Sequence, residues 1–399
     1  MSSNFLPYSR QTIEDDDIAA VAAALSDDFL TTGPGVESFE RAFANATGAS
    51  HAVACNSGTA ALHLPLLALG VGPGDAVIVP SVTFVATANV VRMTGAEVVF
   101  ADVDPDTGLL TPETFAQAIE RAPVERRLAG VMPVHLNGQI CDLAGIAEIA
   151  RSHDMWIVED ACHALGAADV GECRYSAAAA FSTHAVKGIT TGEGGVVVTA
   201  DAESAARMAR LRSHGLVRSD DAYRHPERAR DGDAPARWYY EMPEIGWNYR
   251  LPDILCALGI SQLRKLPRLH AARAELAARY REALAPLAPL VRPVPRDPAQ
   301  DGWHLFPILI DFADTHHTRA TLMETLRQSG IGTQVHYIPV HTQPYYEARY
   351  GTQALPGADA YYAHCLSLPF FPGMTGGDVV RVVEALGAAL SGSNREELR

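Results

Sequence analysis

Lys187 stands in a loop rich in glycine and threonine, directly after a short apolar run that ends at Ser182. An amine in such a place can be desolvated, which lowers its pKa and frees the nitrogen to attack an aldehyde. A surface lysine beside a turn is the simpler interpretation, and for a lysine considered alone it is the more common one. The lysine therefore indicates carbonyl chemistry only if other residues support it.

Asp160 follows a second apolar run, residues 155–159, which is typical of a buried strand. A carboxylate at the end of such a strand needs a cationic partner, because an unpaired buried charge is costly. A protonated pyridine nitrogen would be such a partner, and the carboxylate would keep the ring an electron sink. An aspartate that caps the next helix is an equally good interpretation.

Ser57, Gly58 and Thr59 form a turn of small residues that opens a helix. The free backbone N–H groups at a helix start face outward and suit an anion such as phosphate. Many helices begin in this way, so an ordinary N-cap is the default interpretation. Together, however, an amine, an acid and a phosphate cradle form one compatible set. Their order is the one expected in a pyridoxal-phosphate enzyme with the aspartate-aminotransferase fold.

The elements that must position these residues are short apolar strands alternating with amphipathic helices. Continuous apolar strands separated by helices indicate an α/β fold with a mostly parallel sheet covered on both faces. In such sheets ligands bind beyond the carboxyl ends of the strands, which is where the three groups fall. The expected strands are 76–80, 97–101, 130–134, 155–159, 178–182 and 195–199, with helices at 83–93 and 143–153.

The second half of the chain predicts a surface excursion and then a smaller α/β domain. Residues 219–240 are charged and predict the excursion, and the proline-rich stretch 286–298 should break a helix. Further helices are expected at 253–263, 276–284, 318–329 and 378–390, and strands at 306–311 and 332–336. We expect a large cofactor-binding domain over residues 1–252 and a smaller C-terminal domain over 253–399, with the N-terminal segment free to pack on the small domain.

Composition excludes several other classes of protein. The chain has 399 residues, 48% of them hydrophobic, and a net charge of −15, which argues against a nucleic-acid partner. No stretch of about eighteen residues is free of charges and helix breakers, so no membrane span is expected. The N-terminus is acidic where a secretory signal would be apolar. Six scattered cysteines without a CxxC pair predict reduced thiols in a cytoplasmic protein.

Over nearly its whole length the chain resembles the DegT/DnrJ/EryC1/StrS family of sugar aminotransferases. The motifs that carry the resemblance lie, in order, at 28–34 (DFLTTGP), 56–59 (NSGT), 80–84 (PSVTF), 159–161 (EDA), the segment around Lys187, 336–341 (HYIPVH) and 367–369 (SLP). The resemblance implies a pyridoxal-phosphate-dependent transferase of fold type I, aspartate aminotransferase-like, with a large domain and a smaller C-terminal α/β domain.

The resemblance also implies roles around the cofactor, pyridoxal 5′-phosphate. Lys187 would carry it as a Schiff base and move protons, and Asp160 would pair with its ring nitrogen. Phe84 would stack on the ring, a core aromatic being the alternative. His163 would lie near its phenolic oxygen.

The phosphate and substrate contacts follow from the same resemblance. Gly58, Thr59 and Ser182 would bind the phosphate, and Asn248 would reach the phosphate of a neighbouring subunit, which implies a homodimer with a shared active site. The residues expected at the substrate are Thr31, Thr32, Arg250, His336 and His341. A structural ion pair is the alternative for Arg250, and packing or hydrogen bonding is the alternative for both histidines. Glu193 would order the loop after the lysine.

The residues before the lysine, His184-Ala185-Val186, are similar to the His-Pro-Val of the pseudaminic-acid pathway aminotransferases, which form UDP-4-amino-4,6-dideoxy-N-acetyl-β-L-altrosamine. That subgroup implies ping-pong transfer of the amino group of L-glutamate to C4 of UDP-2-acetamido-2,6-dideoxy-β-L-arabino-hex-4-ulose. Departures at Thr183, Ala185 and Gly188 leave the exact sugar open, so the alternative substrate is another nucleotide-linked ketosugar or a cyclitol ketone. An alternative from another class is a pyridoxal-phosphate-binding protein without transaminase activity.

Overall fold

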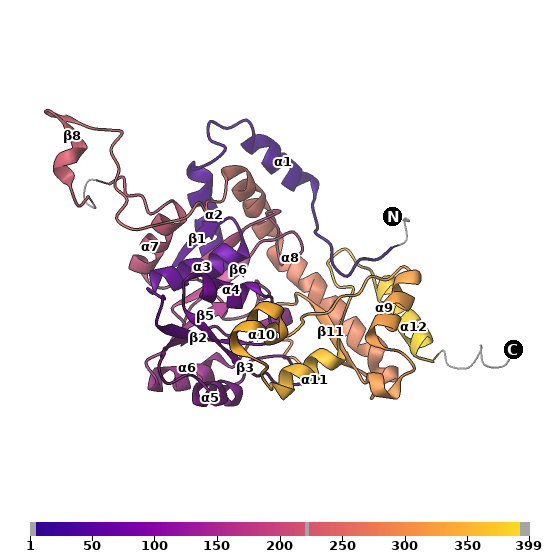
Figure 1. Cartoon of the computed structure of the whole chain (residues 1–399). Coiled ribbons are helices and arrows are strands. Elements are labelled where there is room, and N and C mark those ends of the chain that lie inside the picture. The colour runs from indigo at the N-terminus through magenta and orange to yellow at the C-terminus, as the bar shows by residue number, and fades with distance from the viewer. Residues whose placement is uncertain (1–4, 220–222, 392–399) are drawn as a thin grey trace.

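The structure is a computed structural model that describes residues 5–219 and 223–391 (Figure 1). A seven-stranded sheet lies at its centre, in the order β1-β7-β6-β5-β4-β2-β3. Its strands are β1 (His51–Cys55), β2 (Asp75–Pro80), β3 (Glu97–Ala101), β4 (Arg127–Val131), β5 (Trp156–Asp160), β6 (Ala178–Ser182) and β7 (Gly195–Thr199). Only β7 runs antiparallel to its neighbours, and the other strand pairs are parallel. The expectation of a mostly parallel α/β sheet is confirmed.

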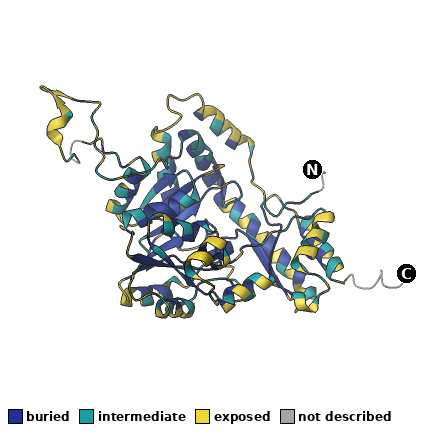
Figure 2. Ribbon diagram, viewed as in Figure 1, coloured by how far each residue is buried: buried dark blue, intermediate teal, exposed yellow. Residues whose placement is uncertain are grey.

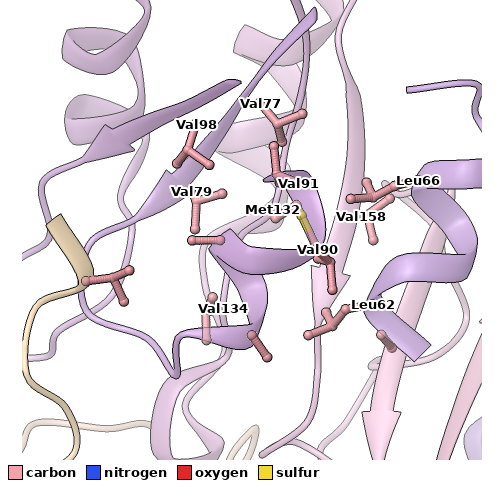
Figure 3. Packing of buried hydrophobic residues seen from close by; sticks show 14 of the residues in the cluster. Leu62, Leu66, Val77, Val79, Val90, Val91, Val98, Met132, Val134 and Val158 are labelled. Atoms are coloured by element: carbon pink, nitrogen blue, oxygen red, sulfur yellow. The ribbon is translucent and has the colours of Figure 1, made fainter. Parts of the chain in front are cut away.

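Helices cover both faces of this sheet, because side chains alternate along each strand. On one face, valines of β2, β3 and β5 pack against α3 (Gly58–Ala68) and α4 (Ala86–Met93), as Figure 3 shows around Val79 and Val90. On the other face, Ile78 and Val131 pack against α5 (Pro112–Glu120) and α6 (Leu143–Ser152). Figure 2 shows the resulting buried centre beneath helices that are exposed on their outer sides. Because the sheet is buried on both faces, the ends of its strands have fixed positions.

The helix α8 (Asp253–Leu284) joins the large sheet to a second hydrophobic core. The segments expected at 253–263 and 276–284 are the two ends of this single helix, which continues through Pro267. Leu263 and Leu266 lie in a core that also contains Phe39. Leu276 and Tyr280 belong to the second core. Because burial on both sides of the proline stabilises the helix, one missing backbone hydrogen bond does not break it. The domain boundary near residue 252 stays a prediction.

The second core lies under a three-stranded antiparallel sheet of β10 (Val291–Pro293), β11 (Phe306–Ile310) and β12 (Cys365–Leu368). The helices α9 (Arg319–Gln328) and α12 (Gly376–Ser391) pack on it, close to the expected ranges. The strand expected at 332–336 is wrong, since Gln334 forms only an isolated bridge with Ser367. The N-terminal segment also packs here, because Leu6 pairs with the backbone around Ile331 and is buried in the second core.

Residues 219–240 form the expected surface excursion, which projects from the body beside α7 (Figures 1 and 2). Residues 220–222 of that range lie outside the described residues. The excursion contains a small hairpin. The aromatic residues Trp238 and Tyr240 at the end of the excursion are solvent-exposed, and Trp238 is 68% exposed. The remaining elements are α1 (Asp15–Ala24), α2 (Pro34–Thr47), α7 (Ala202–Arg212), α10 (Pro344–Tyr350), α11 (Pro356–His364), β8 (Arg230–Asp231), β9 (Ala234–Pro235) and the short 3-10 helices Leu136–Gly138, Pro226–Ala229, Ala285–Leu287, Phe312–Asp314 and Val340–Thr342.

Two further features of the chain are the polarity of its helices and the state of its cysteines. Within residues 5–219 and 223–391, no helix combines the length and apolar character needed to cross a bilayer. All six cysteines are free thiols, and five of them are buried.

Candidate active site

The carboxyl ends of β1, β5 and β6 lie at the same edge of the sheet. At this edge Gly58 lies next to Ser182. A Cβ atom built on Gly58 would lie 2.9 Å from Cβ of Ser182, so only glycine allows this close approach. The hydroxyl of Ser57 accepts a hydrogen bond from the backbone N–H of Ala60 and caps α3. The N–H groups of Gly58 and Thr59 have no acceptor among the described residues. This helix start therefore presents free donors beside a serine hydroxyl, which is the chemistry of an anion site.

Asp160 ends β5 as a buried carboxylate held by two donors. Its Oδ2 accepts from Oγ1 of Thr87 at 2.7 Å, and its Oδ1 accepts from the N–H of Cys162 at 3.2 Å. Thr87 in turn lies 2.8 Å from the hydroxyl of Thr83. No basic side chain of the described chain forms an ion pair with Asp160, and no helix begins directly after it. Capping therefore does not explain this carboxylate, which leaves a place for a cationic ligand atom.

The preceding residue, Glu159, gives an instructive contrast. It points to the opposite face of the sheet, where its carboxylate lies 2.9 Å from Nε2 of His135 and accepts a hydrogen bond from Ser176. Both of its oxygens have protein partners, so Glu159 is part of the fold. Of the two neighbouring acids, only Asp160 lacks a cation.

Lys187 lies in a loop that is closed by Thr183 and Thr191, whose hydroxyls are 2.6 Å apart. Its side chain is partly buried, and its amine forms neither a hydrogen bond nor an ion pair with any residue that the structure describes. Desolvation lowers the pKa of the amine, while its neighbours Cys162 and Asp160 act in the opposite direction. The amine is thus close to Asp160 and easier to deprotonate than an ordinary lysine.

Arg273 of α8 binds the backbone of this loop. Its guanidinium donates to the carbonyl of Lys187 at 3.2 Å and to that of Gly188 at 3.4 Å. Burial lowers the pKa of this guanidinium to about 10. No local sequence pattern indicates this contact, because 86 positions separate the two residues.

Phe84 lies at the rim of the site, and its side chain is 57% exposed. The alternative of a core aromatic is therefore wrong. Its ring centroid is 6.0 Å from that of Tyr337, a residue that sequence reasoning missed although it lies inside the motif at 336–341. Tyr337 also reaches His163, whose Nε2 lies 3.2 Å from its hydroxyl. Phe84, Tyr337 and His163 thus line one side of the site as a continuous row of rings.

The two histidines expected at the substrate are placed differently. His336 packs against Tyr8 and Tyr337, with Nδ1 2.8 Å from the hydroxyl of Ser367. Burial lowers its pKa to about 3, so it is neutral. His341 is buried, and its Nδ1 lies 2.6 Å from the hydroxyl of Ser81. In the described part of the chain it has no contact with Lys187 or Asp160, and its hydrogen bond fits the alternative of a role in packing.

The other expected residues lie at the surface. Arg250 forms no ion pair or hydrogen bond within the described ranges, so nothing supports the alternative of a structural ion pair. Thr31 and Thr32 are exposed in a loop that Asp253 fixes by accepting from the N–H groups of Gly33 and Gly35.

Asn248 and Glu193 are exposed as well. The Asn248 backbone carbonyl accepts from Nδ2 of Asn56 at 3.2 Å, next to the start of α3. Glu193 lies 3.8 Å from His184, on the far side of the lysine loop.

A lysine beyond β6, an aspartate at the end of β5 and a helix start with free backbone donors at α3 define a pyridoxal-phosphate-dependent transferase of fold type I. Residues 11–387 match the model of the DegT/DnrJ/EryC1/StrS aminotransferase family, and the chain belongs to that family. Enzymes of this family use pyridoxal phosphate, and an unpaired buried carboxylate, a desolvated amine and free backbone donors match the charges of that cofactor.

Solved structures agree with this assignment. Helicobacter pylori PseC, an aminotransferase involved in the biosynthesis of pseudaminic acid, is 30% identical, with 97% of this chain and 99% of that one covered and a TM-score of 0.85. DesI, solved in the presence of its TDP-sugar product, is 31% identical, with 98% and 94% covered and a TM-score of 0.84. Spr1654 from Streptococcus pneumoniae, a putative sugar aminotransferase in its PMP form, is 27% identical, with 97% and 99% covered and a TM-score of 0.86.

Proposed function

We propose that the enzyme transfers the amino group of L-glutamate to C4 of a UDP-linked 4-keto-6-deoxy-N-acetylhexosamine, of the UDP-2-acetamido-2,6-dideoxy-β-L-arabino-hex-4-ulose type, in a ping-pong reaction. One observation carries the chemistry. It is the desolvated, unpaired amine of Lys187 beside Asp160, a buried carboxylate without a cation. The substrate rests on the similarity to PseC and on the residues before the lysine.

The ring nitrogen and the phosphate of pyridoxal phosphate would each meet a complementary group in the site. When bound, the cofactor supplies a conjugated ring that takes up the electron pair released at the substrate carbon. Asp160 would keep the ring nitrogen protonated, with Thr87 fixing the carboxylate. Gly58, Thr59 and Ser182 would hold the phosphate, and Phe84 would cover a ring face.

Lys187 would act twice, first as the attachment point and then as the base. As the base, its free amine would take a proton from the donor's α-carbon. The lowered pKa favours this step because it leaves more of the amine neutral. Arg273 would keep the loop in place during the exchange, since it holds the lysine's carbonyl.

We further propose a homodimer with a shared site. Exposed apolar side chains lie in the segment that leads to Asn248, at Trp238, Tyr240, Met242 and Ile245, and such surface is typical of a protein interface. The exposed side chain of Asn248 would then reach the phosphate bound by the partner subunit. Free thiols and a nucleotide-sugar substrate support a cytoplasmic enzyme. The substrate would lie near Thr31, Thr32, Arg250 and His336, with His341 as a more remote contact.

A TDP-linked 4-ketosugar is the second candidate substrate. The supporting observation is the 31% identity to DesI, which was solved with a TDP-sugar product. The residues around Lys187 favour the UDP-linked sugar, but the two relatives are about equally similar to this chain.

The deciding experiment offers UDP-, TDP- and GDP-linked 4-ketosugars with L-glutamate and identifies the products by mass and NMR. We expect a UDP-linked 4-amino sugar and 2-oxoglutarate, and no product with Lys187→Ala. Amination of the TDP sugar alone would establish the second candidate. If L-glutamate leaves the visible absorbance of the bound cofactor unchanged, the protein is a cofactor-binding protein without transaminase activity.

A further inference from the structure

Both ring nitrogens of His163 are engaged by the protein. The backbone N–H of Asn137 donates to Nδ1 at 3.2 Å, and Nε2 lies 3.2 Å from Oη of Tyr337. The family resemblance places His163 near the phenolic oxygen of the cofactor. Because both of its nitrogens already have a protein partner, a further donor to that oxygen would come from another group.

The surroundings of His163 fix its protonation. Its ring centroid is 4.4 Å from that of His304, and the side chain is buried. Desolvation, with the nearby Lys187 and His336, lowers its pKa well below the usual value, so the ring is neutral. A neutral imidazole whose Nδ1 accepts a hydrogen bond carries its single proton on Nε2. Nε2–H therefore donates to the hydroxyl oxygen of Tyr337.

This hydrogen bond leaves the proton of Tyr337 without an acceptor. The hydroxyl receives the His163 proton, and its own O–H has no acceptor among the residues that the structure describes. The side chain is only partly buried, and its ring lies beside that of Phe84, which would cover the cofactor. Desolvation raises the pKa of Tyr337, and Asp160 adds to this shift, so the phenol keeps its proton. Tyr337 is a preoriented donor at the edge of the cofactor pocket.

We propose that Tyr337 donates a hydrogen bond to the phenolic oxygen of pyridoxal phosphate, and that His163 is a positioning residue that orients Tyr337. Besides its aldehyde, the cofactor has three polar groups, which are the ring nitrogen, the phosphate and the phenolic oxygen. Asp160 accounts for the ring nitrogen, and the Gly58 and Ser182 cradle accounts for the phosphate. The phenolic oxygen is the remaining acceptor, and the free O–H of Tyr337 is its complement. This inference rests on the cofactor site that underlies the proposed function.

A pH titration of the bound cofactor's visible absorbance tests this contact directly. A donor to the phenolic oxygen stabilises its anion, so removal of the donor makes the neighbouring lysine-linked nitrogen hold its proton more tightly. For the reconstituted Tyr337→Phe variant we expect the midpoint to rise by about one pH unit, a tenfold change in proton affinity. His163→Ala should give a smaller rise in the same direction, since Tyr337 remains.

Tyr280→Phe is the matched control, because Tyr280 is a buried tyrosine that donates to the carbonyl of Pro369 in the second core. It should titrate like the wild type. A wild-type midpoint in Tyr337→Phe, or a larger shift in His163→Ala than in Tyr337→Phe, would overturn the proposal. A wild-type protein that takes up no pyridoxal phosphate would instead overturn the proposed function from which it starts.

A second measurement needs no Tyr337 variant. In ¹⁵N NMR of the wild-type protein, with His163 assigned by comparison with His163→Gln, Nε2 should carry the proton and Nδ1 should not. A proton on Nδ1 would overturn the proposal even if the variants failed to fold.

Discussion

Lys187 and Lys265 are the only two lysines of the sequence, and their surroundings are opposite. Nζ of Lys265, on α8, lies 2.5 Å from Asp16, 2.7 Å from Asp17 and 3.4 Å from Glu14. Desolvation opposes its charge, but the carboxylates prevail and its pKa is raised. Lys187 is also desolvated, but no carboxylate bonds to its amine, and its pKa is lowered. Burial lowers the pKa of both lysines. The presence or absence of bonded carboxylates decides whether the pKa is finally raised or lowered.

The comparison separates a structural lysine from a reactive one. A raised pKa means that Lys265 stabilises the fold at neutral pH and loses this effect only as pH rises through that pKa. A lowered pKa means that Lys187 gives up its proton more readily, which a nucleophile and base requires. Substitutions at the two lysines and at the cofactor site test this distinction.

The largest effect is expected from Lys187→Ala. Loss of both the attachment point and the base should reduce turnover by about 10⁴-fold or more in a folded protein. Lys265→Arg is the control, because it keeps the charge near Asp17 and should remain active. Steady-state rates with L-glutamate check both variants, and an active Lys187→Ala would remove this lysine from its role.

Asp160→Asn should come next, with turnover lower by about 10²- to 10³-fold. An amide cannot hold the ring nitrogen protonated, but it preserves the hydrogen bond from Thr87, so cofactor affinity should fall less than turnover. The matched change on the other face is Glu159→Gln, which should lower the melting temperature and leave the absorbance of the bound cofactor unchanged. Equal kinetic losses in the two variants would contradict the assignment of Asp160.

Lys265→Met should lower the free energy of unfolding by about 3 kcal/mol, because it leaves the fully buried Asp17 without its cation. Urea denaturation at neutral pH measures this loss, and activity should be retained under native conditions. The difference from the wild type should shrink as pH rises above 10.5, the ordinary lysine value, through the raised pKa of Lys265. An unchanged difference across that range would refute the ion-pair explanation.

The smallest effect is expected from Gly58→Ala. The added methyl group would press against Ser182 and narrow the phosphate cradle, which should weaken cofactor binding about tenfold, or about 1.4 kcal/mol. Gly72→Ala is the control, since its nearest neighbour, the carbonyl oxygen of Thr94, would be 3.9 Å away. Fluorescence titration of the apoprotein with pyridoxal phosphate compares the two.

The residues at strand ends could be predicted from the sequence, because an apolar run followed by a polar turn places its last residues at the carboxyl edge of the sheet. Gly58, Asp160, Ser182 and Lys187 all follow this rule. The strand expected at 332–336 is wrong, since among the described residues Gln334 of this segment forms an isolated bridge with Ser367 of β12 and no ladder.

Contacts between distant parts of the chain could not be predicted in this way. Thr87 meets Asp160 across 73 positions, and His163 meets Tyr337 across 174. Lys265 finds Asp16 across 249 positions. No local pattern encodes such pairs, because tertiary packing alone brings them together. The different chemistry of the two lysines therefore becomes visible only in the folded chain.

The most direct test is borohydride reduction of the protein loaded with pyridoxal phosphate, followed by proteolysis and mass spectrometry. With two lysines in the chain, the outcome is nearly binary. We predict one pyridoxyl phosphate group per chain, on the peptide that contains Lys187, and none on Lys265. A label on Lys265, or a bound cofactor that reduction does not attach to Lys187, would contradict the account.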